Sequence, residues 1–188
     1  MVKVGFICEG DTEKLVIESP KFQELLKQLE IACVSPVIDA KGNGNLLPDK
    51  IEPFRTILMK NGAEKIIVLT DLDQDSCITL TRNRIMEKEN QAIIVSVKEI
   101  EAWFLADSIT MSSLLRESFH TEQPEFESDA FHKIKTLSQE KTNRGIGTKP
   151  RLAKRIIGLG FSVENAANHP NCPSAKYFIE KLKSVSQK

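Results

Sequence analysis

Acidic side chains follow two of the apolar segments that have the character of buried strands. Glu9 comes directly after the first of these segments, and Asp71 and Asp73 come directly after the third. Ligands of parallel sheets bind at the carboxyl ends of the strands, so we expect these acids to share one edge. Residues two apart on an extended chain point the same way, so Asp71 and Asp73 are expected to face one ligand. Gly10 lets the chain turn sharply without covering Glu9.

Three carboxylates in one place repel each other unless protons or a cation neutralise them. Mg²⁺ prefers oxygen ligands at about 2.1 Å and retains several waters, which makes it the natural counter-ion. The pattern therefore predicts a Mg²⁺ site, with Mn²⁺ as the substitute, that binds phosphate through the metal. The alternative is that Glu9 and Asp71 are turn or N-cap residues, which are common after strands. Their joint placement favours the metal site.

The elements that would position these acids alternate between strands and helices. The predicted strands are residues 4–8, 34–40, 66–70 and 92–95, and the helical patterns between them cover 13–18, 21–30, 46–58 and 79–89. From residue 108 onward the apolar spacing is only helical, over 112–119, 130–140, 149–159 and 174–185. This order is typical of an α/β fold with a parallel sheet of about four strands flanked by helices. We expect a core at 1–107 and a helical C-terminal subdomain at 108–188.

The motifs at the two strand ends resemble a known domain. Glu9-Gly10-Asp11-Thr12-Glu13, together with Asp71-Leu72-Asp73, is similar to the Toprim domain that topoisomerases, bacterial primases and overcoming-lysogenization-defect (OLD) nucleases share. The Glu-Gly-x-Thr-Glu form is most similar to the nuclease branch. The layout of nearly the whole chain, including residues 99–107 and 172–174, resembles an uncharacterised prokaryotic Toprim-like family classed as a domain of unknown function.

This resemblance implies a Toprim-like, Rossmann-like core and a set of roles. Glu9 would be a metal ligand or proton-transfer group, Asp71 and Asp73 would hold Mg²⁺, and Asp75 and Glu101 are further candidate ligands. The sequence departs from the topoisomerase and primase pattern, because no glycine follows the aspartates, and Cys172 and Ala175 stand where Ser and Phe are expected. With no tyrosine-nucleophile or polymerase module, strand passage and priming are not expected.

Two other enzymes use an Asp-x-Asp sequence. In haloacid-dehalogenase phosphatases the first Asp attacks phosphate and the second protonates the leaving group. That motif needs Thr or Val where Asp75 stands here, and it belongs to the first strand rather than the third. A sugar-nucleotide transferase motif is a weaker match. Both alternatives are therefore secondary to the metal-dependent site.

Other residues that could bind a ligand or take part in a reaction have simpler structural explanations. Gly42-Asn43-Gly44 could cradle phosphate, but without a Walker lysine a flexible loop is the better interpretation. Trp103 and Phe104 could stack on bases, yet their apolar surroundings predict core packing. The three histidines share no metal-ligand spacing, and no role is assigned to them.

A basic segment lies in the last third of the chain. Residues 133–155 hold eight basic residues and one acid, a local net charge of +7, and residues 99–131 before them carry −7. The basic segment could contact a phosphate backbone, with Lys149, Arg151 and Arg144 as the candidate binding residues. The alternative is a solvated helix face that pairs with the acidic segment. We give both equal weight.

Composition excludes several classes of protein. The 188 residues carry 26 basic and 26 acidic side chains, so the net charge of zero does not favour a nucleic-acid coat protein or a membrane-surface binder. The four cysteines form no Cys-x-x-Cys pair, which argues against a zinc knuckle. With no signal-like or membrane-spanning apolar run in sight, we expect a cytoplasmic protein and no membrane partner.

The leading prediction is a Toprim-fold, Mg²⁺-dependent nuclease that cleaves phosphodiester bonds of DNA or RNA, with phage defence or mobile-element biology as its setting by analogy. Its catalytic residues would be Glu9, Asp71 and Asp73. The alternative is a non-catalytic subunit that binds nucleotide or nucleic acid beside a separate ATPase, since the chain has no Walker motif. A second copy of the chain is the other candidate protein partner.

Overall fold

The computed structural model, which describes residues 1–186, contains a four-stranded parallel sheet. The strands are β1 (Val2–Cys8), β2 (Ile31–Asp39), β3 (Lys65–Asp71) and β4 (Gln91–Ser96), in the order β2-β1-β3-β4. The two central strands are buried on both faces, as continuous apolar runs in a parallel sheet must be. The expected α/β fold, with about four parallel strands flanked by helices, is confirmed.

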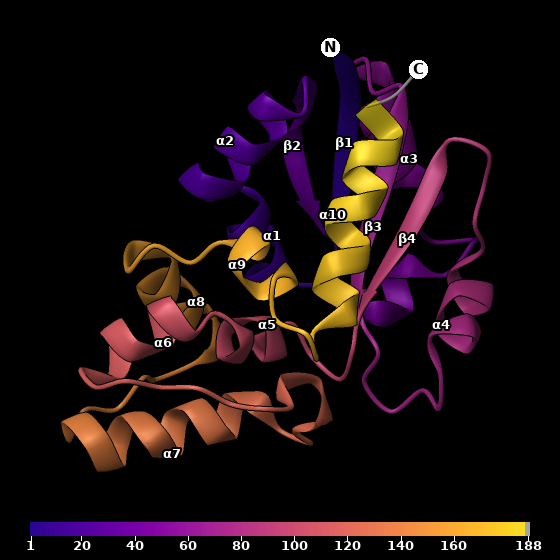
Figure 1. Ribbon diagram of the computed structural model, residues 1–188. Helices are drawn as coiled ribbons and strands as arrows, with labels where there is room; N and C mark the ends of the chain where they lie inside the picture. Colours follow the sequence, from indigo (N-terminus) through magenta and orange to yellow (C-terminus); the bar gives the residue numbers. More distant parts are fainter. Residues whose placement is uncertain (187–188) are drawn as a thin grey trace.

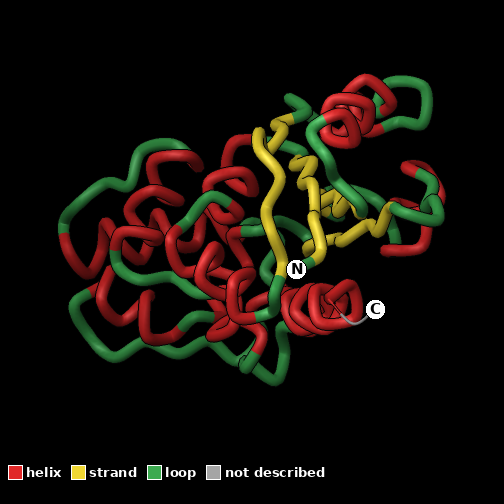
Figure 2. The backbone as a smooth tube through the Cα atoms, turned by 90° about the horizontal axis from the view of Figure 1, so that it is seen from above, coloured by secondary structure: helices red, strands yellow, loops and turns green. Residues whose placement is uncertain are grey.

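Helices cover both faces of this sheet (Figures 1 and 2). One face carries α1 (Asp11–Ile17), α2 (Pro20–Gln28) and the long α10 (Pro173–Ser186), whose apolar side chains join one buried cluster. The other face packs against α3 (Glu52–Lys60) and α4 (Ile78–Ile85). Gly5 in β1 lies so close to α3 that a Cβ atom there would meet Leu58 at 2.9 Å, so the residue type permits this packing.

The remaining helices gather beside the carboxyl ends of the strands (Figure 1). They are α5 (Glu101–Ala106), α6 (Ser108–Leu115), α7 (Ala130–Thr142), α8 (Lys149–Gly158) and α9 (Val163–Ala167), with a 3-10 turn η2 at Pro124–Phe126. Short polar side chains start several of them: Asp107, Asp129 and Ser162 each accept a backbone N–H at the N-cap. None of the described helices is both long and apolar enough to cross a bilayer.

Among the local differences between the predicted and the observed elements, two have a clear physical reason. The helix expected over residues 46–58 begins only at Glu52, and Asn43–Leu46 form a separate 3-10 turn, η1. The reason is Pro48, because Leu47 before it takes the extended conformation that a following proline favours. The helix α9 was not expected, since five residues are too few to show a period.

The C-terminal helices share the core of the sheet. The Phe178 ring of α10 stacks on Phe22 of α2 at 5.5 Å and on Trp103 of α5 at 5.7 Å, measured between ring centroids. The expected role of Trp103 and Phe104 in core packing is confirmed, since both are fully buried. The boundary at residue 107 stays a prediction, and residues 187–188 of the second expected unit lie outside the described part.

Replacing Phe178 by Ala tests this shared core. The change removes a fully buried ring from the contact between α2, α5 and α10, so we expect the free energy of unfolding to fall by about 3–5 kcal/mol. Urea unfolding followed by circular dichroism measures it. The matched control is Phe126→Ala, because Phe126 is 78% exposed and its loss should cost under about 0.5 kcal/mol. Equal losses in both variants would contradict the packing described.

Candidate functional site

Glu9 is fastened across the end of the neighbouring strand. Its Oε2 accepts the Asp71 backbone N–H at 3.1 Å and the hydroxyl of Thr70, both from β3. Because β1 and β3 are adjacent and parallel, their carboxyl ends necessarily bring these residues together. Burial raises the pKa of Glu9, and the two hydrogen bonds oppose that rise. The structure therefore places Glu9 beside Asp71, as the sequence indicated.

Asp71 is almost wholly buried at the end of β3, with 7% of its surface exposed. Its Oδ1 accepts the Ile100 backbone N–H at 2.9 Å and the Ser96 hydroxyl, which joins it to β4 and to the start of α5. Burial raises its pKa well above the usual value, and the nearby charge of Glu13 adds to the rise. One oxygen of Asp71 is thus occupied by structural contacts.

Glu13 and Glu101 complete a cluster of four carboxyl groups. Glu13, on the first turn of α1, is 4% exposed, and its Oε2 accepts the Gly10 N–H at 3.1 Å. Glu101, the first residue of α5, is fully buried, and neither of its oxygens accepts a hydrogen bond among the described residues. Burial raises the pKa of each group to about 7. For Glu13, the charges of Glu101 and Glu9 contribute to this rise.

Sequence reasoning gave Glu13 no role, although it lies inside the quoted motif. The signal that could have identified it is its position three residues after Gly10. A glutamate there forms the capping hydrogen bond that turns it back toward the strand end. Glu101 was a candidate ligand, and it does lie with this cluster.

Lys149, at the start of α8, supplies a positive charge to the cluster. Its Nζ lies 2.6 Å from Glu99 Oε2 and 3.4 Å from Glu101 Oε2. Burial alone would lower the pKa of Lys149, but the carboxylates of Glu101 and Glu99 outweigh it and raise the pKa. Lys149 therefore stays protonated and positively charged beside these acids.

These groups line one cavity of about 440 Å³. Its walls come from the end of β1, the start of α1, the loop after β2, and the first residues of α5 and α8. The lining residues are Glu9, Gly10, Asp11, Thr12, Glu13, Asp39, Lys41, Gly42, Glu101, Lys149 and Pro150. The Gly42 N–H donates to the Glu9 carbonyl at 2.8 Å, so this amide is not free to bind a phosphate.

Asp73 and Asp75 turn away from this cavity. The φ angle of Asp73 is +49°, so the extended conformation ends at Asp71 and its alternation does not reach Asp73. Asp73 Oδ2 accepts from Asn43 Nδ2 at 3.0 Å, and Asp75 accepts from Thr81 and Arg84 of α4. Both aspartates line a different cavity of about 330 Å³. Asp73 still raises the pKa of Glu9 through its charge, and its role as a ligand stays a prediction.

The donor set fits a hard divalent cation in its chemistry, because it consists of carboxylate oxygens and includes the unpaired oxygens of Glu101. As the side chains stand, no three or more His, Cys, Asp or Glu residues between positions 1 and 186 are grouped so as to hold a metal ion. The carboxylates therefore surround a cavity, but in these positions no three of them share one metal-binding point.

The basic segment divides into paired and unpaired residues. Lys133 pairs with Glu127, Lys141 with Glu117, and Lys149 with Glu99 and Glu101, so three of its bases bind acids of the preceding segment.

The other two candidate phosphate-binding residues are solvent-accessible. Arg144 and Arg151 are exposed and form no ion pair within the described chain. Arg151 is two residues beyond Lys149 on α8, and its side chain lies close to Gly147.

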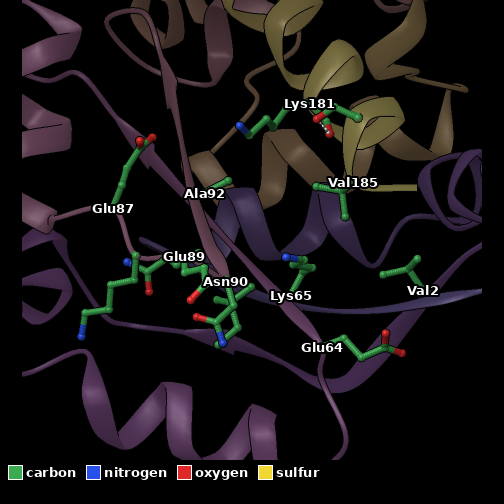
Figure 3. A pocket seen from close by; sticks show the side chains of 13 residues that line it. Val2, Glu64, Lys65, Glu87, Glu89, Asn90, Ala92, Lys181 and Val185 are labelled. Carbon is green, nitrogen blue, oxygen red and sulfur yellow. Dashed lines mark hydrogen bonds between the residues drawn. The ribbon is translucent and has the colours of Figure 1, made fainter. Parts of the chain in front are cut away.

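Another cavity, of about 480 Å³, lies at the opposite end of the sheet (Figure 3). Val2 and Lys65 at the first residues of β1 and β3 line it, together with Lys181 and Val185 of α10. Because it faces the amino ends of the strands, it is separate from the carboxylate cluster.

Comparison with protein-family models gives no match, and comparison with curated proteins gives none either. Among solved structures, the chain is similar to the C-terminal region of the Burkholderia pseudomallei OLD protein. The TM-score is 0.48 and the identity 18%, over 98% of this chain and 99% of that one. A likeness at this level does not define an activity. Membership of the uncharacterised Toprim-like family stays a prediction, and function has to be inferred from the site.

Replacing Glu13 by Gln tests the crowding of the carboxyl groups. Burial raises the pKa of Glu13 from 4.5 to about 7, so between these values the folded protein holds a proton that the unfolded chain releases. Stability is therefore lost as the pH rises through this window. We expect Glu13→Gln to raise the free energy of unfolding by about 1–3 kcal/mol at pH 8 and to change it little at pH 4.

Urea unfolding at the two pH values measures the effect of Glu13→Gln. The matched control is Glu24→Gln, on the exposed face of α2, which should change stability by under about 0.5 kcal/mol at either pH. A Glu13→Gln variant that is less stable than the wild type at pH 8 would show that burying the charged carboxylate does not destabilise the folded protein.

Proposed function

We propose that this protein is a Toprim-type phosphodiesterase that depends on a divalent cation and cleaves nucleic acid. One observation supports this most directly, namely the gathering of four acids at one edge of the sheet, each with a pKa raised by burial. They are Glu9 after β1, Glu13 on α1, Asp71 at the end of β3 and Glu101 on α5. A cluster of buried acids is costly to fold. Clefts with perturbed titratable groups are typical of functional sites.

Glu9, Glu13 and Glu101 line the cavity and would hold the cation. Asp71 lies next to Glu9, whereas Asp73 lines a separate cavity and would have to turn to join them. Mg²⁺ or Mn²⁺ in this place would polarise a phosphate and lower the pKa of its bound water. Glu9 is well suited to a fixed orientation, because the Asp71 N–H and the Thr70 hydroxyl both bind its Oε2 and leave Oε1 outside these two contacts. Asp71 has a positioning role for Ile100 and so for Glu101.

The substrate of such a site is polyanionic, and the basic segment at residues 133–155 supplies charges that suit it. Arg144 and Arg151 are exposed and unpaired within the described chain, and Lys149 reaches the cavity itself. Arginine binds phosphate oxygens with two parallel hydrogen bonds, which orients a backbone over the site. We assign phosphate binding to these three residues.

A second candidate function is a non-catalytic subunit that binds nucleotide or nucleic acid beside a separate ATPase. This candidate is favoured because two of the acids already have partners inside the protein. Asp71 accepts hydrogen bonds from Ser96 and Ile100, and Lys149 lies close enough to Glu101 to pair with it. A site whose charges are satisfied internally can bind a ligand without performing chemistry.

Cleavage assays on single- and double-stranded DNA and RNA, with Mg²⁺ or Mn²⁺, separate the two candidates. We expect the wild type to cut at least one substrate, and we expect Glu9→Gln and Asp71→Asn to lower the rate by about 100-fold or more. Asp49→Asn, an exposed acid outside the site, is the matched control and should keep the wild-type rate. Unchanged rates in both site variants would refute the mechanism, and an inactive wild type would favour the subunit.

Nucleic-acid binding at rising salt concentration tests the arginines. Each residue that neutralises a phosphate contributes about 0.9 to the slope of log affinity against log salt. We expect Arg144→Ala and Arg151→Ala each to lower that slope by about 1, measured by fluorescence anisotropy with a labelled oligonucleotide. Lys60→Ala on α3 removes an exposed charge elsewhere and should leave the slope unchanged. Equal slopes in all variants would exclude phosphate binding by Arg144 and Arg151.

A further inference from the structure

Lys149 is held unevenly by its two acidic partners. The contact to Glu99 Oε2, at 2.6 Å, is a short ion pair, whereas the contact to Glu101 Oε2, at 3.4 Å, is longer than a hydrogen bond to a charged group should be. Glu101 is fully buried and accepts no hydrogen bond from the described residues. The ammonium ion is therefore the one positive charge that lies against the Glu101 oxygens within the described chain.

Glu99 is a rigid support for this lysine. Its Oε1 accepts the Phe131 backbone N–H at 2.7 Å, in the first turn of α7, while its Oε2 holds Lys149. One carboxylate is thus fixed from both sides. The four-carbon side chain of Lys149 can consequently turn about the Glu99 contact and leave Glu101 without losing its ion pair.

We propose that the Lys149 ammonium is the resident counter-ion of the carboxylate cavity, and that a divalent cation binds there by displacing it from Glu101. The proposal rests on the proposed function in one respect, namely that the cavity takes a divalent cation. It deepens that function by naming the group that controls occupancy. Lys149 would remain on Glu99 when the cation is bound.

Electrostatics favours this exchange. Two positive charges within about 4 Å of each other repel in a buried site, so the ammonium weakens cation binding as long as it stays against Glu101.

The binding of Mn²⁺, in the absence of nucleic acid, tests the proposal. We expect Lys149→Met, which keeps the length of the side chain but removes the charge, to bind Mn²⁺ about 10-fold more tightly than the wild type. Electron paramagnetic resonance of free Mn²⁺ or calorimetry gives the dissociation constant. The matched control is Lys154→Met, an exposed lysine on the same helix, which should change it by less than about 2-fold.

A change at Glu99, which supports Lys149, should alter the Mn²⁺ affinity in the opposite direction. Glu99→Gln removes the closer of the two acids that pair with Lys149 and leaves Glu101 as the other, so Mn²⁺ should bind several-fold more weakly than to the wild type. In the Lys149→Met background the same change should have little effect, because no ammonium ion is left to move. This non-additivity distinguishes displacement from a general loss of negative charge.

The dissociation constants of Mn²⁺ for Lys149→Met and for the wild type decide whether Lys149 is displaced. Tighter binding by Lys149→Met, or binding by that variant alone, supports the proposal, and unchanged or weaker binding overturns it, as does a failure of both proteins to bind Mn²⁺. If Lys149→Met does not fold, Lys149→Gln replaces it, since an amide can still bind Glu99. A wild type that binds Mn²⁺ and cleaves no nucleic acid would refute the proposed function while leaving the displacement intact.

Discussion

Burial of like charges at one edge of the sheet is the constraint on which the rest of this structure depends. Of the adjacent parallel strands, β1 is followed directly by Glu9 and β3 ends in Asp71, and helices cover both faces of the sheet around them. Removing carboxylates from water disfavours their charged form unless protons, an internal cation or an added ion compensates. Protons compensate in part, because the pKa values of Glu13 and Glu101 are raised. An internal cation also compensates, because Lys149 lies against Glu101.

The helices after β4 contribute to the site as well as to the core. The start of α5 supplies Glu101, and the start of α8 returns to α1 with Lys149. Helix α10 fastens this part of the chain to the sheet, because Ser174 at its start accepts the Trp103 indole N–H at 2.7 Å and donates to buried Glu125. A site assembled from both parts of the chain can change its charge balance when a single helix end moves.

Part of this site could be predicted from the sequence. Apolar runs that end in acids, in a parallel order, are enough to place Glu9 next to Asp71, because topology alone fixes that contact. The same reasoning does not give the direction of Asp73, since strand alternation stops where φ turns positive, and a local backbone angle leaves no periodic signal. Glu13 was missed because capping geometry decides its direction. The pairing of Lys149 with Glu99 depends on contacts fifty residues apart, which spacing does not reveal.

Anomalous diffraction from crystals soaked in Mn²⁺ tests the central claim most directly, namely that the buried acids form a cation-dependent phosphodiester site. The account predicts an anomalous peak in the cavity, within about 2.1–2.3 Å of oxygens from Glu9, Glu13 or Glu101, and Lys149 moved off Glu101. An empty cavity at saturating Mn²⁺, with Lys149 still against Glu101, would contradict it.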